Sequence, residues 1–454
     1  MNTPHLNYNN IEIADLCNFY PGIRAGLLYL AYAPLAGASF LSDADNIIKL
    51  ENAISQAPEE QNESISPLIT QLLDSSDANF ENRIVTSPKK YTKLSILPNL
   101  ICNFSCAYCY SAKGRSKEEI SQEKLQTTLD YFIDNKRIDD KELTIFISGG
   151  GEPILSWEKV KYIIEYSRKK ATEQGFRLEL LLMTNGSLIT PDIANFLKDQ
   201  QVEVGVSFEI LPDIQQTQRG KYEQVKKNIL MMLERGLIPS ISSVITAQNV
   251  YRMEEMAQVV INDYPEIRHL NFDPAMSNEL FDNETMLDVF YQRFEEYFFK
   301  AKRLCGAYHI TLDCNIVRRA EKIFPRYCQG KLCLVPNGDI SICHTVSSPK
   351  EMAYEDAIYG KVTKDSIVFD ELKFRNLIDA SQYLLSECQS CIAKWHCAGG
   401  CMMYRRNYDK EKFRAVCHFT QKMIGKILLA KLDTAYKERH HIGIKELLHD
   451  YIIK

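Results

Sequence analysis

The stretch Cys102-Asn-Phe-Ser-Cys106-Ala-Tyr-Cys109 spaces three cysteines as C-x3-C-x2-C. The β-rich run 93–97 comes just before it, which predicts that the cysteines lie on a loop after a strand. Three thiolates on one tight loop can bind three irons of a small cluster and leave the fourth iron open to an exchangeable ligand. A structural zinc ion would need a fourth ligand, and the nearest histidine is far away in the sequence. We therefore expect an iron–sulfur cluster here, rather than zinc or three buried cysteines on a turn.

The residues on the C-terminal side of this loop predict a repeating β/α fold. Short β-rich runs alternate with longer amphipathic segments from about 91 to 275, which predicts a parallel sheet with right-handed crossovers, open or closed into a barrel. A βα barrel carries its chemistry on the loops that follow the strands. The expected strands are 93–97, 143–147, 179–183, 202–208, 239–246 and 268–272, and the expected helices are 121–134, 157–174, 191–199, 222–235, 252–262 and 283–305.

Further glycine-rich or polar segments follow the next expected strands. The second strand leads into Gly149-Gly150-Gly151-Glu152-Pro153, where glycines permit a close backbone approach to a ligand and Glu152 offers acceptors to a cation. The third ends in Thr184-Asn185-Gly186, for which a plain Asn-Gly turn is the competing interpretation. The fourth ends in Ser207-Phe208-Glu209, and Arg219 follows in the next segment.

Together, the cysteine loop and these strand ends resemble the radical S-adenosylmethionine (radical SAM) superfamily. The resemblance implies that Cys102, Cys106 and Cys109 hold a [4Fe–4S] cluster whose open iron binds the amino and carboxylate groups of SAM. An electron from this cluster would then cleave SAM to methionine and a 5′-deoxyadenosyl radical. The resemblance further implies that Tyr108 lies against the adenine, Gly150, Gly151 and Glu152 receive the methionyl ammonium, Thr184 and Asn185 lie near the nucleoside, Ser207 bonds the ribose and Arg219 grips the SAM carboxylate.

One part of the motif departs from the family. Many relatives carry Asp-Gly after the serine of the fourth strand, whereas this chain has Phe208-Glu209-Ile210. Glu209 is therefore left without a role. A solvated charge at a helix start remains the competing interpretation of Arg219.

A second cysteine system fills the C-terminal part of the chain. Cys328 and Cys343 precede the run Cys388-x2-Cys391-x5-Cys397-x3-Cys401, and Cys417 comes after a gap. A zinc ribbon accounts for C-x2-C but not for the x5 and x3 steps. The pattern resembles the SPASM domain, an extension of one radical SAM subgroup that binds auxiliary clusters. The resemblance implies an auxiliary cluster II on Cys388, Cys391, Cys397 and Cys417, and an auxiliary cluster I on Cys328, Cys343 and Cys401.

Auxiliary cluster I lacks a fourth ligand in this assignment. We rank Cys314 first as that ligand, an open iron that binds the substrate second, and Cys333 last. The turn Pro336-Asn337-Gly338 predicts a hairpin that would let Cys328 and Cys343 approach one another. The remaining cysteines, Cys17 and Cys305, are expected to be buried small apolar side chains.

Composition excludes several other classes of protein. Of the 454 residues 45% are hydrophobic and 25% are charged, which is typical of globular domains, and a net charge of −5 gives no basic face for nucleic acid. The uncharged stretch 25–42 is long enough for a membrane helix, but Pro34 and Gly37 interrupt it and favour a hairpin. Without a recognisable secretory signal, we expect a cytoplasmic protein whose clustered thiols serve metal binding or catalysis.

We expect an α/β chain of four parts: a small N-terminal α+β domain (1–90), a partial (β/α)6 TIM-like barrel of the radical SAM type (91–300), a SPASM domain (301–430) and a C-terminal helical tail (431–454). The N-terminal domain is expected to contain the hairpin and helices near 45–55 and 66–73. It could bind the leader of a peptide as an added strand, or it could cap the open side of the barrel.

Because radical SAM–SPASM relatives act mostly on peptides and proteins, the resemblance implies a peptide maturase, an oxidoreductase that forms a thioether or other crosslink. Its implied partners are a precursor peptide or protein and an external electron donor such as a flavodoxin or ferredoxin, without nucleic acid or membrane. One alternative is the oxidation of Cys or Ser in a sulfatase to formylglycine, with Asp273 after the sixth strand as a candidate base. The other, of a different class, is a non-catalytic iron–sulfur redox sensor or scaffold.

Overall fold

The computed structural model describes residues 11–55, 66–73, 85–276, 278–378, 386–401, 405 and 408–452. They fold into two compact units. The larger unit spans 85–314 and 328–379, and the smaller unit combines the N-terminal residues up to 84 with 315–327 and 380–454.

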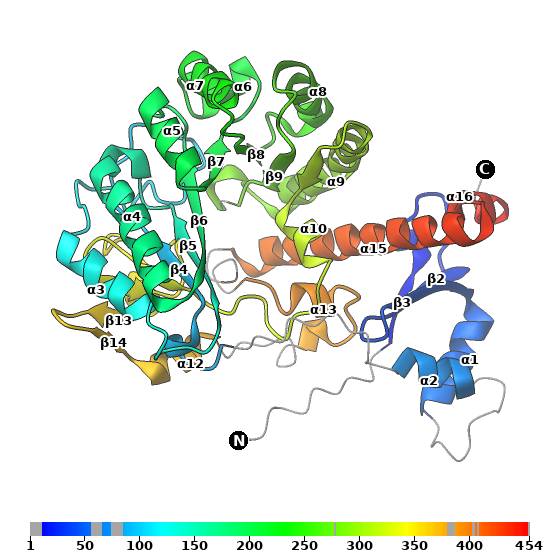
Figure 1. The fold of residues 1–454 in the computed structure, drawn as a ribbon. Helices are drawn as coiled ribbons and strands as arrows, with labels where there is room; N and C mark the ends of the chain where they lie inside the picture. The colour runs from blue at the N-terminus through cyan, green and yellow to red at the C-terminus, as the bar shows by residue number, and fades with distance from the viewer. Residues whose placement is uncertain are drawn as a thin grey trace. The chain divides into compact units, whose positions relative to one another are not determined.

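The larger unit is built on one sheet, whose central strands are parallel and follow one another in chain order (Figure 1). The six predicted strands all form, and the predicted α/β fold with a parallel sheet is thereby confirmed. Inward positions alternate with exposed ones, as expected for strands that carry helices on one face. The strands are β4 (Lys93–Ile96), β5 (Glu142–Ile147), β6 (Arg177–Thr184), β7 (Glu203–Ser207), β8 (Ser240–Ile245) and β9 (His269–Pro274), and β10 (Thr311–Asp313) adds a further parallel strand beside β9.

The predicted helices lie along the outer side of this sheet (Figure 1). Polar caps start several of them: the side chains of Ser121, Thr190 and Asn283 each accept a hydrogen bond from a backbone N–H in the first turn. Gly175 ends the second helix with φ 74°. The helices are α3 (Gln122–Phe132), α4 (Trp157–Gln174), α5 (Pro191–Asp199), α7 (Tyr222–Glu234), α8 (Met253–Asp263) and α9 (Glu284–Ala307). A short helix that we did not predict, α6 (Pro212–Gln218), follows β7.

A β-meander covers the free edge of β4. The strand β11 (Leu332–Leu334) pairs in parallel with β4, and β12 (Asp339–Ser341), β13 (Ile358–Val362) and β14 (Ile367–Phe369) continue antiparallel from it. The predicted hairpin at Gly338 is confirmed, with a φ of 90° at this glycine. Because β4 precedes the cysteine loop, the added strand removes an exposed sheet edge next to the site.

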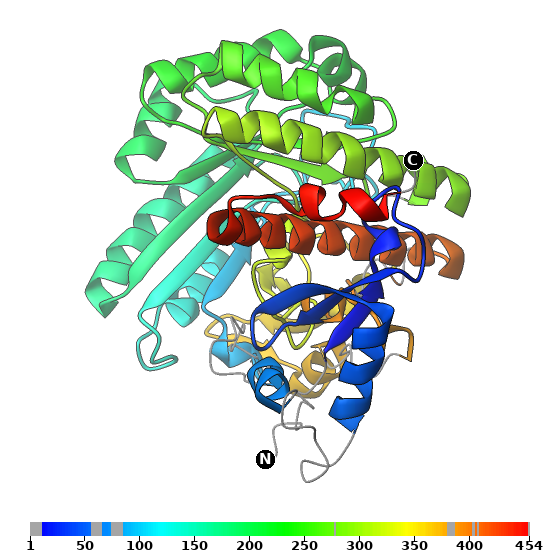
Figure 2. The same cartoon turned by 90° about the vertical axis from the view of Figure 1, so that its right-hand side faces the viewer.

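The smaller unit contains a three-stranded antiparallel sheet, β1 (Glu12–Asp15), β2 (Leu28–Ala33) and β3 (Ala38–Asp43). The predicted hairpin forms β2 and β3, whereas β1 was not predicted. The two predicted helices are α1 (Ala44–Ser55) and α2 (Ser66–Leu73), and their apolar faces pack on β2 through a buried cluster of Ala33, Leu50, Ala53, Ile69 and Leu72. The helical tail expected from 431 begins inside the long helix α15 (Lys410–His440), which lies against β3 (Figure 2).

Buried polar contacts tie this small sheet to the short helix α13 (Lys394–Cys397). The Glu12 carboxylate pairs with the Lys394 ammonium at 2.7 Å and accepts a hydrogen bond from the Trp395 indole at 3.0 Å. The Tyr32 hydroxyl lies 2.8 Å from Nε2 of His396. The segment that ends in Cys397 is therefore fixed to the N-terminal sheet. Across the described ranges, no helix has the length and apolar character needed to span a membrane.

Candidate active site

The three cysteines of the predicted cluster loop lie after β4 and are free thiols that are partly accessible to solvent. Burial raises the pKa of the Cys106 thiol, the charge of Arg219 lowers it, and the sulfurs of Cys109 and Cys102 raise it again. The sulfurs of Cys102 and Cys109 and the guanidinium of Arg219 are thus within electrostatic range of the Cys106 thiol. Arg115 adds a second cation, since its guanidinium donates to the Cys109 sulfur at 3.3 Å.

The glycines after β5 allow the cysteine loop to approach this strand end. A Cβ on Gly151 would lie 1.9 Å from the carbonyl oxygen of Ile101, and a Cβ on Gly150 would lie 2.7 Å from that of Asn99. Gly150 also adopts a φ of 63°, which disfavours any side chain. The glycine motif therefore serves close packing against the residues just before Cys102. Its expected contact with the methionyl ammonium stays a prediction.

Glu152 is 2% exposed and connects two strand ends. One carboxylate oxygen accepts from the Thr184 hydroxyl at 2.6 Å, and the other accepts from the Asn185 backbone N–H at 2.7 Å. Burial raises the pKa of this carboxyl, while these hydrogen bonds lower it. Both oxygens thus have partners within the protein, and the carboxylate fixes the loop after β6 to the loop after β5.

Asn103 connects the cysteine loop to the Thr184-Asn185-Gly186 segment. The Asn185 side chain donates to the amide oxygen of Asn103 at 2.8 Å, and Asn103 donates to the Ser187 hydroxyl at 2.9 Å. Gly186 has a φ of 74°, and a Cβ there would lie 2.8 Å from the Val206 side chain. The segment is therefore more than a plain turn, because its side chains hold the loop of the cysteines.

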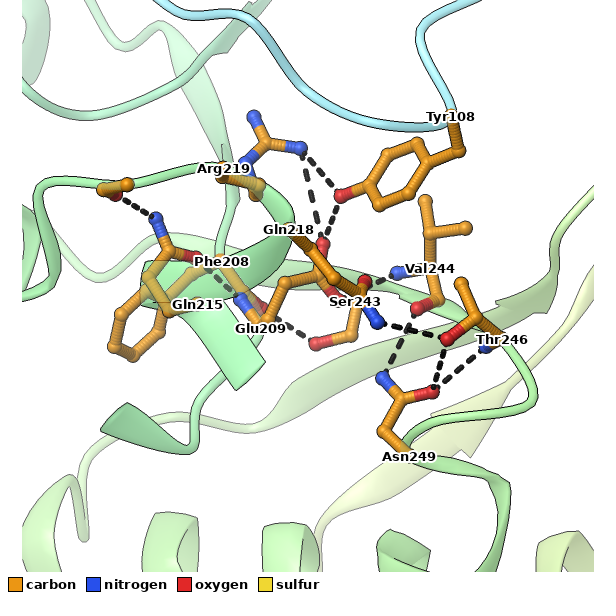
Figure 3. Close-up of polar contacts among 11 residues, drawn as sticks. Tyr108, Phe208, Glu209, Gln215, Gln218, Arg219, Ser243, Val244, Thr246 and Asn249 are labelled. Atoms are coloured by element: carbon orange, nitrogen blue, oxygen red, sulfur yellow. Dashed lines mark hydrogen bonds and ion pairs between the residues drawn. The ribbon is translucent and has the colours of Figure 1, made fainter. Parts of the chain in front are cut away.

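A buried polar cluster lies at the end of β7 (Figure 3). Arg219 donates from Nη1 to the Tyr108 hydroxyl at 2.9 Å, and the same nitrogen lies 3.8 Å from Oε1 of Glu209. The Tyr108 hydroxyl also donates to Glu209, which is fully buried. The side chain of Arg219 is only 9% exposed. The alternative of a solvated charge at a helix start is therefore wrong, because Arg219 ends α6 in the interior.

Several buried polar atoms around the cysteine loop have no partner among the described residues. They are the Nε atoms of Arg219 and Arg115, the Ser148 hydroxyl and the amide oxygen of Gln218. Leaving such an atom unpaired costs about 1–3 kcal/mol. Two orphaned guanidinium nitrogens beside three thiols fit an anionic ligand and an iron–sulfur cluster at this loop. Ser207, at the end of β7, is partly exposed and stays a predicted ribose contact.

Four of the predicted auxiliary ligands gather in the smaller unit. The pKa of Cys397 is raised to about 12, mainly by burial; the charge of Arg319 opposes this rise, and Cys417, Cys391 and Cys388 contribute to it. These four thiols are therefore within electrostatic range of one another, and their assignment to auxiliary cluster II stays a prediction. In the ranges that the structure describes, no three Cys, His or carboxylate side chains form a site for a single metal ion. A cluster differs in this respect, because each thiolate binds a different iron.

The remaining cysteines have varied surroundings. Cys333 is fully buried on β11 among Leu97 and Val335, where burial raises its pKa to about 12. Cys314, at the end of β10, is also fully buried, as is Cys305. Cys328 is exposed, and Cys343 and Cys401 are partly exposed. The ligands of auxiliary cluster I stay a prediction.

The sequence left several of these residues without a function. Glu209 was given no role, and Arg115, Asn99 and Asn103 were not singled out. Asn99 is fully buried and donates to the Glu152 carbonyl oxygen at 3.0 Å and to the Ser156 hydroxyl at 2.7 Å. Asn99 lies just before the cysteine motif and Asn103 lies within it, so their polarity next to an apolar strand was the signal that could have found them. No comparable local signal exists for Glu209.

Comparison with known proteins gives a family for the part of the chain that carries this site. Residues 96–260 match the radical SAM superfamily. In sequence, the chain is 28% identical over 141 residues to the radical SAM cyclopropyl synthase TigE of Paramaledivibacter caminithermalis, an alignment that covers 28% of this chain and 29% of TigE. The chain thus spans well under half of that relative.

Two solved structures share the fold. The structure of native anSMEcpe with bound AdoMet aligns with a TM-score of 0.60 at 17% identity, over 74% of this chain and 98% of that chain. The structure of Streptococcus suis SuiB bound to precursor peptide SuiA aligns with a TM-score of 0.50 at 15% identity, over 89% of this chain and 97% of that chain. With the cysteine loop and the glycine segment in place, residues 96–260 form a domain that matches the radical SAM superfamily, and the chain is similar to proteins of that superfamily.

Proposed function

We propose that this protein is a radical SAM maturase that modifies a peptide or protein and forms a thioether or another crosslink in it. The observation that carries the proposal is the convergence of three free thiols with the buried, unpaired Nε of Arg219. When bound, the loop cluster and SAM supply a 5′-deoxyadenosyl radical that abstracts hydrogen, and auxiliary clusters supply an electron acceptor or donor.

The chain's own residues bind and orient these groups. Cys102, Cys106 and Cys109 hold the cluster, and Arg219 receives the SAM carboxylate as a charged donor. The Tyr108 ring shields the adenine. Glycines 150 and 151 let the backbone come close, while Thr184 and Asn185 line the nucleoside side.

We propose ligands for both auxiliary clusters. The thiols of Cys388, Cys391, Cys397 and Cys417 are within electrostatic range of one another, which supports auxiliary cluster II. Auxiliary cluster I is proposed on Cys328, Cys343 and Cys401, with Cys314 as its preferred fourth ligand. The full burial of Cys333 in an apolar cluster agrees with its last place in that ranking.

The N-terminal domain supports a peptide substrate. Its three strands form an antiparallel sheet with two outer edges, and an extended peptide can add to such an edge through backbone hydrogen bonds. SuiB, a fold neighbour, is solved with its precursor peptide. We propose that the domain within 1–90 holds the leader of a precursor peptide, in a cytoplasmic protein reduced by a flavodoxin or ferredoxin.

The first experiment measures the cofactor chemistry. Anaerobically reconstituted and reduced wild-type protein should release 5′-deoxyadenosine from SAM, whereas the triple variant with Cys102, Cys106 and Cys109 changed to Ala should release none. The triple variant should retain its auxiliary iron. A wild-type chain with bound iron that releases no 5′-deoxyadenosine would favour the redox sensor or scaffold instead.

The second experiment tests the peptide. A candidate precursor should lose two hydrogens, seen as a mass decrease of two, when a crosslink forms. Deleting residues 1–85 should weaken the binding of a leader-bearing peptide while the protein still cleaves SAM. Equal binding and modification by the truncated chain would refute leader docking by this domain.

Formylglycine formation remains the second candidate. Asp273 lies near the end of β9, directly opposite Val244 of β8 in the sheet register, and thus one strand from the Glu209 cluster. This place at the carboxyl end of the sheet suits a base. A product that reacts with an aldehyde probe, and loses this reactivity in Asp273→Asn, would support formylglycine over a crosslink.

A further inference from the structure

Glu209 is a buried carboxylate to which neither the sequence nor the proposed function assigns a role. It is 0% exposed, and its Oε2 accepts a hydrogen bond from the Val244 backbone N–H at 3.0 Å. Its Oε1 contacts the Tyr108 hydroxyl and faces Nη1 of Arg219 at 3.8 Å. Because an unpaired buried charge is costly, the two opposite charges stabilise each other in the interior.

The contacts engage only one end of the Arg219 guanidinium. In Figure 3, every dashed line from this group leaves Nη1, toward Tyr108 and Glu209. Nε is buried and has no partner among the described residues. A carboxylate that binds a guanidinium in a fork uses two of its nitrogens, so the unengaged side is suited to a second carboxylate.

The backbone holds Glu209 and Arg219 in this arrangement. The Gln215 side chain accepts from the Glu209 N–H at 2.9 Å and donates to the Gly220 carbonyl at 2.8 Å, so one residue braces both partners. Ile210 is fully buried at a φ of 67°, which is rare for a β-branched residue and costs about 1–3 kcal/mol. Such strain persists only where the surroundings determine the conformation. The turn therefore fixes where the Glu209 side chain points.

The same segment is attached to the cysteine loop. The Ala107 N–H donates to the Gln218 carbonyl oxygen at 3.0 Å, and the Arg219 guanidinium lies over the rings of Phe104 and Tyr108. A shift of Arg219 by the length of one bond would therefore change its place relative to Cys106. The position of the guanidinium, and not only its charge, therefore decides whether Arg219 can reach a molecule that binds at the cysteine loop.

We propose that Glu209 is a positioning residue, which holds the Arg219 guanidinium by Nη1 and so presents its Nε to the carboxylate of SAM. The proposal rests on the proposed function in one respect, the binding of that carboxylate by Arg219. Glu209 itself touches neither SAM nor the cluster. Removing it leaves Nη1 of Arg219 with the Tyr108 hydroxyl as its hydrogen-bond partner and without an opposite charge.

The test is a double-mutant cycle with Glu209→Gln, Arg219→Gln and the double variant, measured as the SAM dissociation constant of the reconstituted protein by equilibrium dialysis. Binding is measured at pH 8, where the Glu209 carboxyl, whose pKa burial raises to about 7, is ionised. Glu203→Gln, an exposed carboxylate at the other end of β7, is the matched control for charge removal. Iron content and thermal unfolding of each variant report whether the fold and cluster persist.

We expect Arg219→Gln and Glu209→Gln each to weaken SAM binding about tenfold or more, and the double variant to bind no more weakly than Arg219→Gln alone. Glu203→Gln should bind like wild type. Glu209→Asp, which keeps the charge on a shorter side chain, should recover part of the affinity and stands in if Glu209→Gln fails to fold.

The outcomes separate the two ideas. If Arg219→Gln binds SAM normally, the assignment of the carboxylate to Arg219 is wrong and the proposed SAM site must be redrawn. If Arg219→Gln weakens binding but Glu209→Gln does not, Glu209 is not a positioning residue. Additive losses in the double variant would also overturn the inference, because Glu209 would then act independently of Arg219.

Discussion

Replacing Gly151 by Ala should separate the cysteine loop from β5. The added Cβ would lie 1.9 Å from the carbonyl oxygen of Ile101 and 2.3 Å from the side-chain oxygen of Asn99. Both distances are far inside van der Waals contact. Since a backbone carbonyl cannot rotate away, one of the two segments must move.

Two effects determine the loss of folding free energy in Gly151→Ala. Overpacking of a close-packed interior costs about 1–3 kcal/mol, and here the upper end applies because the nearest atom is backbone. The Glu152 N–H donates to the same Ile101 oxygen at 2.7 Å, and the loss of that hydrogen bond adds about 0.5–1.5 kcal/mol. We therefore expect a local destabilisation of about 4 kcal/mol, placed one residue before Cys102.

Two other glycines provide matched controls. Gly175 has a φ of 74° and no atom within 4 Å of the position that a Cβ would take, so its change to Ala costs only the left-handed conformation, about 1–2 kcal/mol. Gly306 lies in α9 with open space around it, and its change to Ala should stabilise the helix by about 0.5–1 kcal/mol.

The assay combines iron content, SAM affinity and the midpoint of thermal unfolding. Gly151→Ala should lose about four irons per chain, the content of one cluster, together with measurable SAM binding. Gly175→Ala should keep both and unfold at a slightly lower temperature. If Gly151→Ala keeps its iron and binds SAM as Gly306→Ala does, the close packing of the two segments is not needed for binding either group, and the prediction is wrong.

Three further predictions concern other parts of the chain. Burial raises the pKa of Glu209 from 4.5 to about 7, so between these pH values the folded state keeps a proton that the unfolded state loses. The free energy of unfolding should therefore fall by about 3 kcal/mol between pH 4.5 and pH 7. Urea titrations of Glu209→Gln should lack this fall. Glu12→Ala leaves the buried Lys394 charge without its partner and should cost about 3–5 kcal/mol in the same assay, and a loss below about 1 kcal/mol would contradict a buried pair. Cys397→Ser should remove about four irons, whereas Cys333→Ala should lower thermal stability and keep the iron; equal iron loss in both would make Cys333 a ligand.

Local patterns were enough to predict most elements of the larger unit. The expected helices 157–174 and 191–199 agree with α4 and α5 at both ends, because Gly175 stops the first and Pro191 starts the second. The strand ends were also placed well, and with them the loops of the site. The pattern of neighbouring residues determines these helices and strands, so they can be predicted from a single sequence.

Elements that depend on distant partners were not predicted. The strand β10 has only three residues, and its conformation depends on pairing with β9. The same holds for β1, whose partner β2 lies beyond an intervening 3-10 turn and loop. The meander from β11 to β14 was seen only as one hairpin, because nothing local indicates that β11 joins the edge of β4. A short strand is stabilised by the strands that pair with it in the sheet, and its local sequence does not show which strands those are.

The site, too, has residues that local sequence patterns predict and residues whose role depends on distant partners. Cysteine spacing is a local property, and it was enough to predict which thiols lie on the loop after β4. Glu209, in contrast, gains its meaning from Tyr108 and Arg219, which come from a different loop and from the end of α6. Its departure from the family pattern looked like a missing function, whereas the fold gives the carboxylate a cation in the interior as partner.

The cysteine loop is fastened at three strand ends by bonds that do not involve its sulfurs. Ile101 accepts from Glu152 after β5, Asn103 pairs with Asn185 after β6, and Ala107 donates to Gln218 beyond β7. Binding a cluster to a mobile loop would cost the free energy of ordering it, whereas a fastened loop has already met that cost during folding. The glycines after β5 make the closest of these contacts possible. The glycine segment and the cysteine loop therefore pack as one unit, in which close backbone contact fixes where the three sulfurs lie.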